Sequence, residues 1–342
     1  MDTAGLWQPD LGYLDTANYG LPPRPTLERV RTALSQWETG ETSWEVWDES
    51  VAIARGHFAE LVGTDESRVA VGSTTSEQLG LVAASLPDDA VVVVPEEEFS
   101  SNLFPWLVQE QRGVKVVVVP ASRLAEAIDS STTLVATSAV QSASGDVAPL
   151  DDLSAAARHH GALLAVDATQ ACGWLPLRAD RFDALVAHSY KWLCSPRGAS
   201  FMTVSPRLLD RVRPNAAGWY AAEHTHAAYY GPPLRLSPDA RRLATSPAWF
   251  SWVGAAASLE VLAHIGIEEI HRHDVALANR LRAGLGLEDS NSAIVSLEIE
   301  KSAERLERAG IRASTRAGRT RFSCHLYTTT ADVDRALEAL SG

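Results

Sequence analysis

The sequence predicts an α/β fold, in which a large domain built on a mostly parallel β-sheet is followed by a small C-terminal α+β domain. Short runs rich in β-branched residues recur up to about residue 205, with helical or turn segments between them. These runs are almost continuously apolar, which is typical of strands that are covered on both faces. In the last part of the chain the order changes to alternating helical and extended segments.

The expected elements follow one another from the N-terminus. Residues 1–22 form an N-terminal arm, and residues 23–40 are expected to form an amphipathic helix. The strands of the sheet are expected near residues 68–73, 90–95, 114–120, 133–140, 162–169, 183–189 and 199–205. Residues 257–285 are expected to be helical. The boundary between the large domain, residues 23–260, and the small domain, residues 261–342, therefore lies in or beside this helix.

Composition and charge exclude several classes of protein. The 342 residues carry a formal charge of -13 that is spread along the chain, whereas a nucleic-acid surface needs concentrated basic residues. No apolar run approaches the roughly 20 residues that cross a bilayer. The first residues lack the basic and apolar regions of a targeting signal. We therefore expect a cytoplasmic protein that binds neither nucleic acid nor membrane.

Cysteine and lysine are both scarce. Cys172, Cys194 and Cys324 are far apart and odd in number, which favours reduced thiols over disulfides or a zinc site. Lys115, Lys191 and Lys301 are the only lysines. Few residues are therefore available for lysine chemistry.

Ligands of open α/β sheets gather where strands end and loops begin. Thr75 and Ser76 follow the first predicted strand and precede a helix, whose free N–H groups and positive dipole end suit a phosphate. Plain N-capping explains these hydroxyls equally well. The glycine-rich motifs of dinucleotide and nucleoside-triphosphate sites are absent from the sequence.

Polar residues also follow two later strands. Asp167 and Gln170 end the strand at 162–169, and His188, Tyr190 and Lys191 end the next one. A helix cap or a metal ligand is an alternative role for the carboxylate, although no carboxylate or histidine cluster accompanies it. A buried ion pair with the lysine is another alternative.

One cofactor unites these features. Pyridoxal phosphate needs a phosphate cradle, a carboxylate that keeps its ring nitrogen protonated, and a lysine that forms the imine. A nearby anion favours the pyridinium by about 1–3 pK units. Desolvation lowers the pKa of a lysine from about 10.4 and so frees its amine. Asp167 and Lys191 meet these needs, and Tyr190 and Trp192 help to desolvate the lysine.

With these residues assembled, the chain resembles the class V aminotransferase family. That family is a branch of the fold type I pyridoxal-phosphate enzymes and includes cysteine desulfurases, kynureninases and isopenicillin-epimerase-like proteins. The resemblance spans most of the chain and rests on the blocks "YLDTANYGLPP", "STTSE", "EEEFSSNLFPW", "VDATQACGWLPL", "AHSYKWLCSPRG" and "TRFSCHLYTTTADVD". The blocks "VDATQACGWLPL" and "AHSYKWLCSPRG" are the most specific.

The resemblance implies a role for each matching residue. Lys191 is the expected Schiff-base lysine, Asp167 the partner of the ring nitrogen, and Gln170 the partner of the ring hydroxyl. The phosphate is expected to be held by Thr75, Ser76, His188 and Tyr190.

Three further positions match the family. Ser246, in "LATSPAWF", corresponds to a hydroxyl that reaches the cofactor of the neighbouring subunit, which implies a homodimer with shared active sites; a helix cap is the alternative. Phe99 stands where desulfurases place a histidine over the ring, and it can stack but cannot move protons. Arg321 corresponds to the arginine that grips the substrate carboxylate, with a surface arginine as the alternative.

The resemblance implies an enzyme that transforms an α-amino acid through an external aldimine. The loop "RASTRAGRT" before Arg321 contains no cysteine, and Phe99 replaces the histidine, so a persulfide route is disfavoured. Transamination and elimination by a C–S or other β-lyase are the leading reactions. Epimerisation, a desulfurase-like activity, or a catalytically inactive relative that binds the cofactor are the alternatives.

Overall fold

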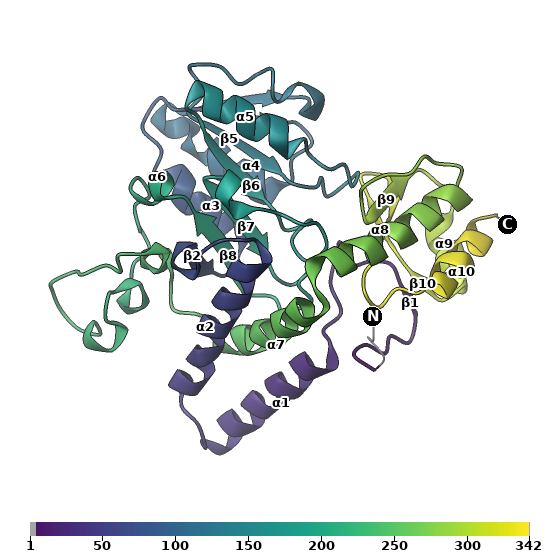
Figure 1. Cartoon of the computed structure of the whole chain (residues 1–342), viewed down its shortest axis with the longest axis horizontal. Helices are drawn as coiled ribbons and strands as arrows, with labels where there is room; N and C mark the ends of the chain where they lie inside the picture. Colours follow the sequence, from purple (N-terminus) through teal and green to yellow (C-terminus); the bar gives the residue numbers. More distant parts are fainter. Residues whose placement is uncertain (1–4, 342) are drawn as a thin grey trace.

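The computed structural model describes residues 5–341 and has a seven-stranded sheet at its centre (Figure 1). The strand order is β2-β8-β7-β6-β5-β3-β4, and only β8 runs antiparallel to its neighbours in this sheet. The strands are β2 (Val69–Gly72), β3 (Val91–Pro95), β4 (Lys115–Val119), β5 (Leu134–Ser138), β6 (Leu163–Asp167), β7 (Ala184–His188) and β8 (Ser200–Val204). All seven predicted strands are present, and the predicted mostly parallel sheet is confirmed.

The apolar runs bury both faces of the sheet. On β6, Leu164 and Val166 pack into one core cluster, whereas Leu163 and Ala165 pack into another on the opposite face. Successive side chains of a strand point to opposite faces, so a strand covered on both sides must be apolar at every position. The sheet is thus a rigid platform whose strand ends carry the polar residues.

Helices surround this platform. The helices of the large lobe are α1 (Arg24–Thr39), α2 (Trp44–Leu61), α3 (Thr75–Ala84), α4 (Ser100–Leu107), α5 (Leu150–His160), α6 (Pro206–Leu209) and α7 (Trp249–Ile265). Helices α1, α2 and α7 pack against one another below the sheet in Figure 1.

The prediction of one continuous helix over residues 257–285 is wrong, because the helix is interrupted at Gly266. Helix α7 ends there and α8 (Ile267–Gly284) begins, with a bend of 83° between them. Gly266 has a φ of 89°, a left-handed value that glycine adopts without steric cost. Within residues 5–341 no single helix is long and apolar enough to cross a membrane, and α7 with α8 meets those criteria only as this bent pair.

The C-terminal residues form a smaller lobe (Figure 1). Its three-stranded antiparallel sheet has the order β11-β12-β9, with β9 (Ile294–Leu297), β11 (Ser314–Arg316) and β12 (Arg319–Ser323). Helices α8, α9 (Ser302–Arg308) and α10 (Thr330–Ser341) accompany it, and Val295, Phe322 and Val333 share its separate core. The predicted domain limits at residues 22 and 260 remain a prediction.

The N-terminal segment connects both lobes. Its strand β1 (Gly12–Tyr13) pairs in parallel with β10 (Ile311–Arg312) of the small lobe. Further along, the backbone N–H of Gly20 donates to the Tyr190 carbonyl at 3.0 Å. A Cβ at position 20 would overlap the Lys191 carbonyl oxygen, so only glycine permits this approach. The segment therefore lies directly against the loop that carries Lys191.

Candidate active site

A cavity of about 300 Å³ lies at the carboxyl ends of the parallel strands. Eight of the predicted site residues line it together: Thr75, Ser76, Phe99, Asp167, Gln170, His188, Tyr190 and Lys191. Ser246 and Arg321 do not line it directly. The strand order explains the gathering, since β3, β5, β6 and β7 are neighbours whose parallel directions bring their ends to one edge.

The first turn of α3 has its cap supplied by Thr74. The Thr74 hydroxyl accepts the N–H of Glu77 at 3.2 Å, and the Glu77 carboxylate accepts the N–H of Ser73 at 2.8 Å. The alternative in which Thr75 or Ser76 is the cap is therefore not what the structure shows. Their hydroxyls and the first N–H groups of the helix line the cavity, which is a setting for an anion.

Asp167 is held in place by Thr169, which also contacts Thr75 after β2 and His188 at the end of β7. Its carboxylate is 5% exposed and accepts the N–H of Thr169 at 2.8 Å. The Thr169 hydroxyl lies 3.0 Å from that of Thr75 and accepts the N–H of His188 at 3.2 Å. Burial raises the pKa of Asp167, while the Thr169 hydrogen bonds and the Lys191 ammonium oppose that rise. A cation placed in the cavity would be stabilised by this carboxylate.

The Lys191 amine is buried and 7% exposed. Burial lowers its pKa to about 8, with Arg321, Arg316 and Arg197 adding to the effect and Asp167 opposing it. Within the described chain no ion pair joins this ammonium to Asp167. The alternative of a closed structural pair is therefore not observed, and the amine is ready to lose its proton near neutral pH.

His188 presents an unsatisfied nitrogen at the same wall. Its ring packs edge-on against Tyr190, with centroids 4.5 Å apart, and its buried Nε2 has no hydrogen-bond partner among residues 5–341. Burial, assisted by Arg197 and Lys191, lowers the pKa of His188 to about 4, so the ring is neutral. A neutral imidazole can still donate one hydrogen bond, which fits a phosphate oxygen in the cavity.

The Gln170 side chain has a defined orientation. Its Oε1 accepts the indole N–H of Trp192 at 2.8 Å, and its Nε2 donates to the Ala17 carbonyl at 2.9 Å and to the Ser142 hydroxyl at 3.0 Å. An indole N–H can only donate, so the amide oxygen must face Trp192. The two hydrogens of the amide nitrogen are consequently both used, one by the Ala17 carbonyl and one by the hydroxyl of Ser142, which lines the cavity.

Arg321 is a buried cation without a carboxylate partner. The side chain, on β12, is 1% exposed and donates to the Ser142 carbonyl at 2.6 Å and to the Ser314 hydroxyl at 3.2 Å. Its Nε has no partner, and no ion pair involves it in the described part of the chain. Burial and then Arg316 lower its pKa to about 10, with Asp15 opposing them. This position is not that of a surface arginine, and an unpaired buried guanidinium favours an incoming carboxylate.

Ser246 lies apart from the other predicted residues. It is exposed in the segment before α7, and the N-cap of that helix is Ala248, so Ser246 is not the cap. The neighbouring Thr245 hydroxyl is 3.4 Å from the Glu77 carboxylate at the start of α3. This segment therefore runs close to the α3 end of the cavity but leaves the Ser246 hydroxyl on the surface.

Sequence reasoning missed Glu98 and Arg197. Glu98 is 8% exposed and accepts the N–H groups of Ser138 at 2.6 Å and Phe99 at 3.0 Å, as well as the Ser138 hydroxyl. It thus fixes the backbone that presents Phe99. Three consecutive glutamates at 96–98 gave no sign of which one is buried. Arg197 lines the cavity, with its guanidinium 4.9 Å from the Tyr190 ring centroid.

All three cysteines are free and buried. Burial raises the pKa of the Cys172 thiol to about 12 and also raises that of Cys324, which is 0% exposed. A thiol must ionise and be reachable to act as a nucleophile. The three thiols are therefore poorly placed for attack on a substrate.

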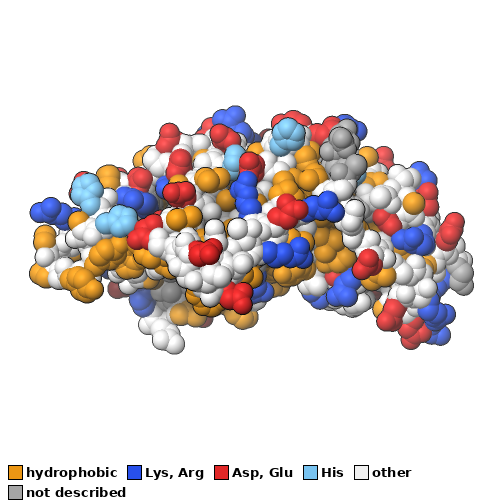
Figure 2. Space-filling view, turned by 90° about the horizontal axis from the view of Figure 1, so that it is seen from below, with side chains coloured by type: hydrophobic (Ala, Val, Ile, Leu, Met, Phe, Trp, Pro, Cys, Tyr) orange, Lys and Arg blue, Asp and Glu red, His pale blue; other side chains and the backbone are white. Residues whose placement is uncertain are grey.

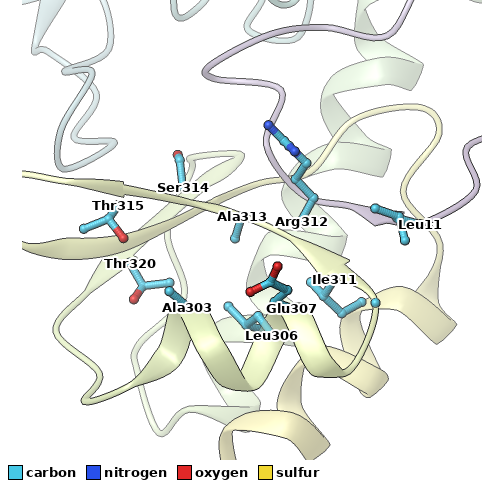
Figure 3. Close-up of a pocket in the computed structure, with 11 residues that line it drawn as sticks. Leu11, Ala303, Leu306, Glu307, Ile311, Arg312, Ala313, Ser314, Thr315 and Thr320 are labelled. Atoms are coloured by element: carbon cyan, nitrogen blue, oxygen red, sulfur yellow. The ribbon is translucent and has the colours of Figure 1, made fainter.

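A second hollow, of about 380 Å³, lies in the small lobe (Figure 3). Leu306, Ile311, Arg312 and Glu307 are among its lining residues, and it contains none of the predicted cofactor residues. The cavity at the strand ends is thus the candidate active site.

A doubly covered parallel sheet that brings a buried lysine, a buried carboxylate and an anion-binding helix end into one cavity is the arrangement of a fold type I pyridoxal-phosphate enzyme. The profile of the family Aminotransferase class-V matches residues 13–307, and the chain belongs to that family. The predicted family, fold type, enzyme class and cofactor are confirmed. The roles of individual site residues remain predictions.

Named relatives agree with this assignment. The chain is 27% identical to the uncharacterized aminotransferase YcbU of Bacillus subtilis strain 168, over 88% of this chain and 85% of that protein. It is 26% identical to isopenicillin N epimerase of Streptomyces clavuligerus, over 98% and 96% of the two chains. A solved structure of the cystine C–S lyase C-DES superposes with a TM-score of 0.87 at 20% identity, covering 97% of each chain.

Proposed function

We propose that this enzyme converts an α-amino acid by transamination or by β-elimination, such as C–S bond cleavage, without a cysteine nucleophile. The observation that carries the proposal is the position of the Lys191 amine. It is buried at the cavity wall with its pKa lowered to about 8 and is joined there by Asp167.

The residues around the cavity fit pyridoxal phosphate. Thr75, Ser76 and the unsatisfied Nε2 of His188 would hold the phosphate. Asp167 would face the ring nitrogen. The Nε2 of Gln170 would face the ring hydroxyl, which would take the place of the Ser142 hydroxyl as acceptor of one amide hydrogen. When bound, the cofactor supplies an aldehyde for amines and a ring that delocalises negative charge from the substrate carbon.

Two side chains would act on the substrate. Arg321 would bind the α-carboxylate, because its guanidinium is buried and lacks a counter-ion among residues 5–341. The Lys191 Nζ would take and return the proton of the substrate carbon, since an amine with a pKa of about 8 exchanges protons near neutral pH. Phe99 would exclude water from the ring face and cannot carry a proton.

The reaction type rests on the cysteines and on the relatives. The three thiols are buried, which disfavours the persulfide route of desulfurases. Similarity to an aminotransferase and to a cystine C–S lyase supports the two leading reactions. Epimerisation, which similarity to isopenicillin N epimerase supports, a desulfurase-like activity and a catalytically inactive relative are the alternatives.

A homodimer with shared active sites is part of this proposal. Leu27, Leu34 and Trp37 of α1 are 40%, 42% and 64% exposed. Hydrophobic side chains also lie exposed among charged ones on the face seen in Figure 2. A second subunit on such a surface would bury these side chains, and a surface Ser246 could then reach the partner's cavity. Equilibrium sedimentation of the wild type and of Trp37→Glu tests this assembly.

The remaining parts of the proposal are location and domain division. Three free thiols support a reducing compartment and hence the cytoplasm. The separate small-lobe core supports a boundary between a large domain, residues 23–260, and a small domain, residues 261–342.

The decisive experiment is a scan of amino acids and sulfur-containing conjugates with the cofactor-loaded enzyme. Released ammonia and pyruvate, or a sulfur product, would identify elimination. Consumption of a keto acid as amino acceptor would identify transamination. Exchange of the α-proton with inversion at the α-carbon, and without release of ammonia or of a sulfur product, would support the epimerase alternative. The complete absence of turnover would support the inactive relative.

A further inference from the structure

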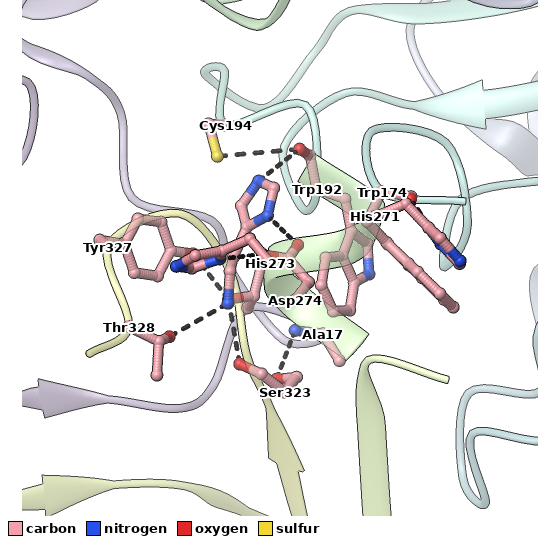
Figure 4. A network of polar contacts seen from close by, with 12 residues as sticks. Ala17, Trp174, Trp192, Cys194, His271, His273, Asp274, Ser323, Tyr327 and Thr328 are labelled. Carbon is pink, nitrogen blue, oxygen red and sulfur yellow. Dashed lines mark hydrogen bonds and ion pairs between the residues drawn. The ribbon is translucent and has the colours of Figure 1, made fainter. Parts of the chain in front are cut away.

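His325 and Asp274 form a buried pair between the small lobe and the loop that carries Lys191. Figure 4 shows the surrounding network of polar contacts, with Asp274 and Trp192 labelled. Both side chains of the pair are 0% exposed, and His325 Nδ1 lies 2.6 Å from the Asp274 Oδ2. Asp274 belongs to α8, and His325 follows β12. On its other side, His325 Nε2 lies 3.0 Å from the carbonyl oxygen of Trp192, the residue after Lys191.

The partners of His325 define its charge. A carboxylate oxygen and a carbonyl oxygen can only accept hydrogen bonds, so both ring nitrogens must carry hydrogen. His325 is therefore an imidazolium. Burial alone would lower its pKa, but Asp274 and Cys194 more than offset this and raise the pKa to about 10. Asp274 also receives His273, whose Nδ1 lies 2.8 Å from the other carboxylate oxygen.

Trp192 carries this contact into the cavity wall. Its carbonyl lies so close to Gly173 that a Cβ at that position would come within 2.5 Å of the oxygen. Its ring packs edge-on against His325, with centroids 5.4 Å apart. Its indole N–H donates to the Gln170 Oε1 at 2.8 Å and so, together with the Ala17 carbonyl that accepts from Nε2 at 2.9 Å, sets the orientation of the Gln170 amide. The second Nε2 hydrogen is directed to the hydroxyl of Ser142, which lines the cavity.

We propose that His325 is a positioning residue for the active site. Clamped between Asp274 and the Trp192 carbonyl, it fixes Trp192, and the Trp192 indole fixes which end of the Gln170 amide faces the cofactor. This inference rests on the proposed function, in which Gln170 Nε2 faces the ring hydroxyl. Asp274 serves the same end by holding the charge on His325.

The test measures the visible absorption of the bound cofactor as a function of pH. The variants are His325→Phe, which removes both hydrogen bonds, and Trp192→Phe, which removes the indole donor and leaves the buried pair intact. We expect the pH midpoint of the absorption of the lysine–cofactor linkage to rise by about one unit in both, because the Gln170 amide is no longer held in place beside the anionic ring oxygen. His325→Phe also removes the positive charge of the imidazolium, whereas Trp192→Phe keeps it. His325→Gln keeps a donor toward the Trp192 carbonyl, so its midpoint should lie between those of the wild type and His325→Phe.

Two matched controls change neighbours of Asp274 and Gln170 without changing the hydrogen bonds from His325 to Trp192 and from Trp192 to the Gln170 side chain. His273→Gln removes the second imidazole from Asp274 and does not touch Trp192. Trp174→Phe removes an indole that donates to the Gln170 backbone carbonyl rather than to its side chain. Both controls should leave the midpoint unchanged.

Unchanged midpoints in His325→Phe and Trp192→Phe, with only a lower melting temperature, would show a purely structural pair and overturn the inference. A shift in His325→Phe with none in Trp192→Phe would overturn the indole route and thus the proposal. If His325→Phe does not fold, Trp192→Phe still decides. A wild-type protein that takes up no pyridoxal phosphate would instead refute the proposed function, so the two failures are distinguishable.

Discussion

The Nζ of Lys191 lies 5.5 Å from the centroid of the Phe99 ring, and Phe99 is 46% exposed at the cavity. The aromatic side chain nearest to the reacting amine on that side therefore has no group that can take up or release a proton. The Tyr190 ring, 5.6 Å from the same Nζ, does carry an ionisable hydroxyl. The proposed function assigns proton transfer to Lys191, and the following predictions test the roles proposed for the cavity residues.

Replacing Lys191 should abolish the covalent attachment of the cofactor. After borohydride reduction, the wild-type protein should gain the mass of the reduced cofactor, and Lys191→Ala should not. Lys301→Ala is the matched control, because Lys301 is one of only three lysines and its side chain is 73% exposed. Cofactor retained covalently in Lys191→Ala would contradict the assignment.

The rate at which the apo-protein attaches pyridoxal phosphate should depend on pH with a midpoint near 8. Burial lowers the pKa of Lys191 to about 8 from its ordinary 10.5, so the free amine accumulates as the pH rises through 8. The rate should therefore rise with pH and level off above about 9. Stopped-flow absorbance measures this profile, and a midpoint near 10.5 would show that the amine is not desolvated.

Asp167→Asn should lower the pKa of the cofactor ring nitrogen by about 1–3 units, because a neutral amide no longer stabilises the pyridinium. The same change removes the carboxylate that opposes the lowering of the Lys191 pKa. Attachment should therefore persist, with a midpoint below that of the wild type, while turnover falls sharply. Asp180→Asn, which alters an exposed ion pair with Arg178, is the control and should keep the wild-type profile.

Arg321→Ala should weaken substrate binding more than cofactor binding. Loss of a charge-assisted contact to a carboxylate corresponds to about a 10- to 100-fold rise in KM. The dissociation constant of the cofactor, measured by fluorescence, should change little. Arg335→Ala, on the exposed face of α10, is the control. Equal losses of substrate and cofactor binding would remove the role assigned to Arg321.

Phe99→Ala should raise the cofactor dissociation constant by about 3- to 10-fold, which matches the free energy of one aromatic stacking contact. Phe99→His should retain most of the affinity, because an imidazole can also stack. Phe104→Ala is the control, since Phe104 is 59% exposed and lies outside the cavity lining. An unchanged constant in Phe99→Ala would mean that Phe99 does not cover the ring.

The strands were predictable because their signal is local. Every residue of β5 to β8 is buried, and each strand is a short run of mostly apolar residues, so the sequence of each run was enough to predict a strand. The break at Gly266 was not, because the apolar pattern continues from α7 into α8 on both sides of the glycine. The conformation of that one residue, with a φ of 89°, decides the bend.

Some residues of the candidate site could likewise be predicted from the sequence, and others could not. Asp167 ends β6 and Lys191 comes three residues after the end of the neighbouring β7, so their positions along the sequence predicted that both would line one cavity. The pair of His325 and Asp274 was not predictable, because 51 residues separate its members and no spacing rule connects them. Glu98 was hidden among two other glutamates that remain exposed.

The N-terminal segment makes the reacting amine sensitive to the position of the small lobe. Gly12 pairs with Ile311, Leu14 and Ala17 are hydrogen-bonded to Ser323 of the small lobe, and Gly20 donates to Tyr190 only three residues after Ala17. A rotation of the small lobe would either break the pairing of β1 with β10 or displace the backbone at Tyr190 and Lys191. We expect a few residues inserted between Ala17 and Gly20 to let the small lobe change its position without displacing the loop that carries Lys191.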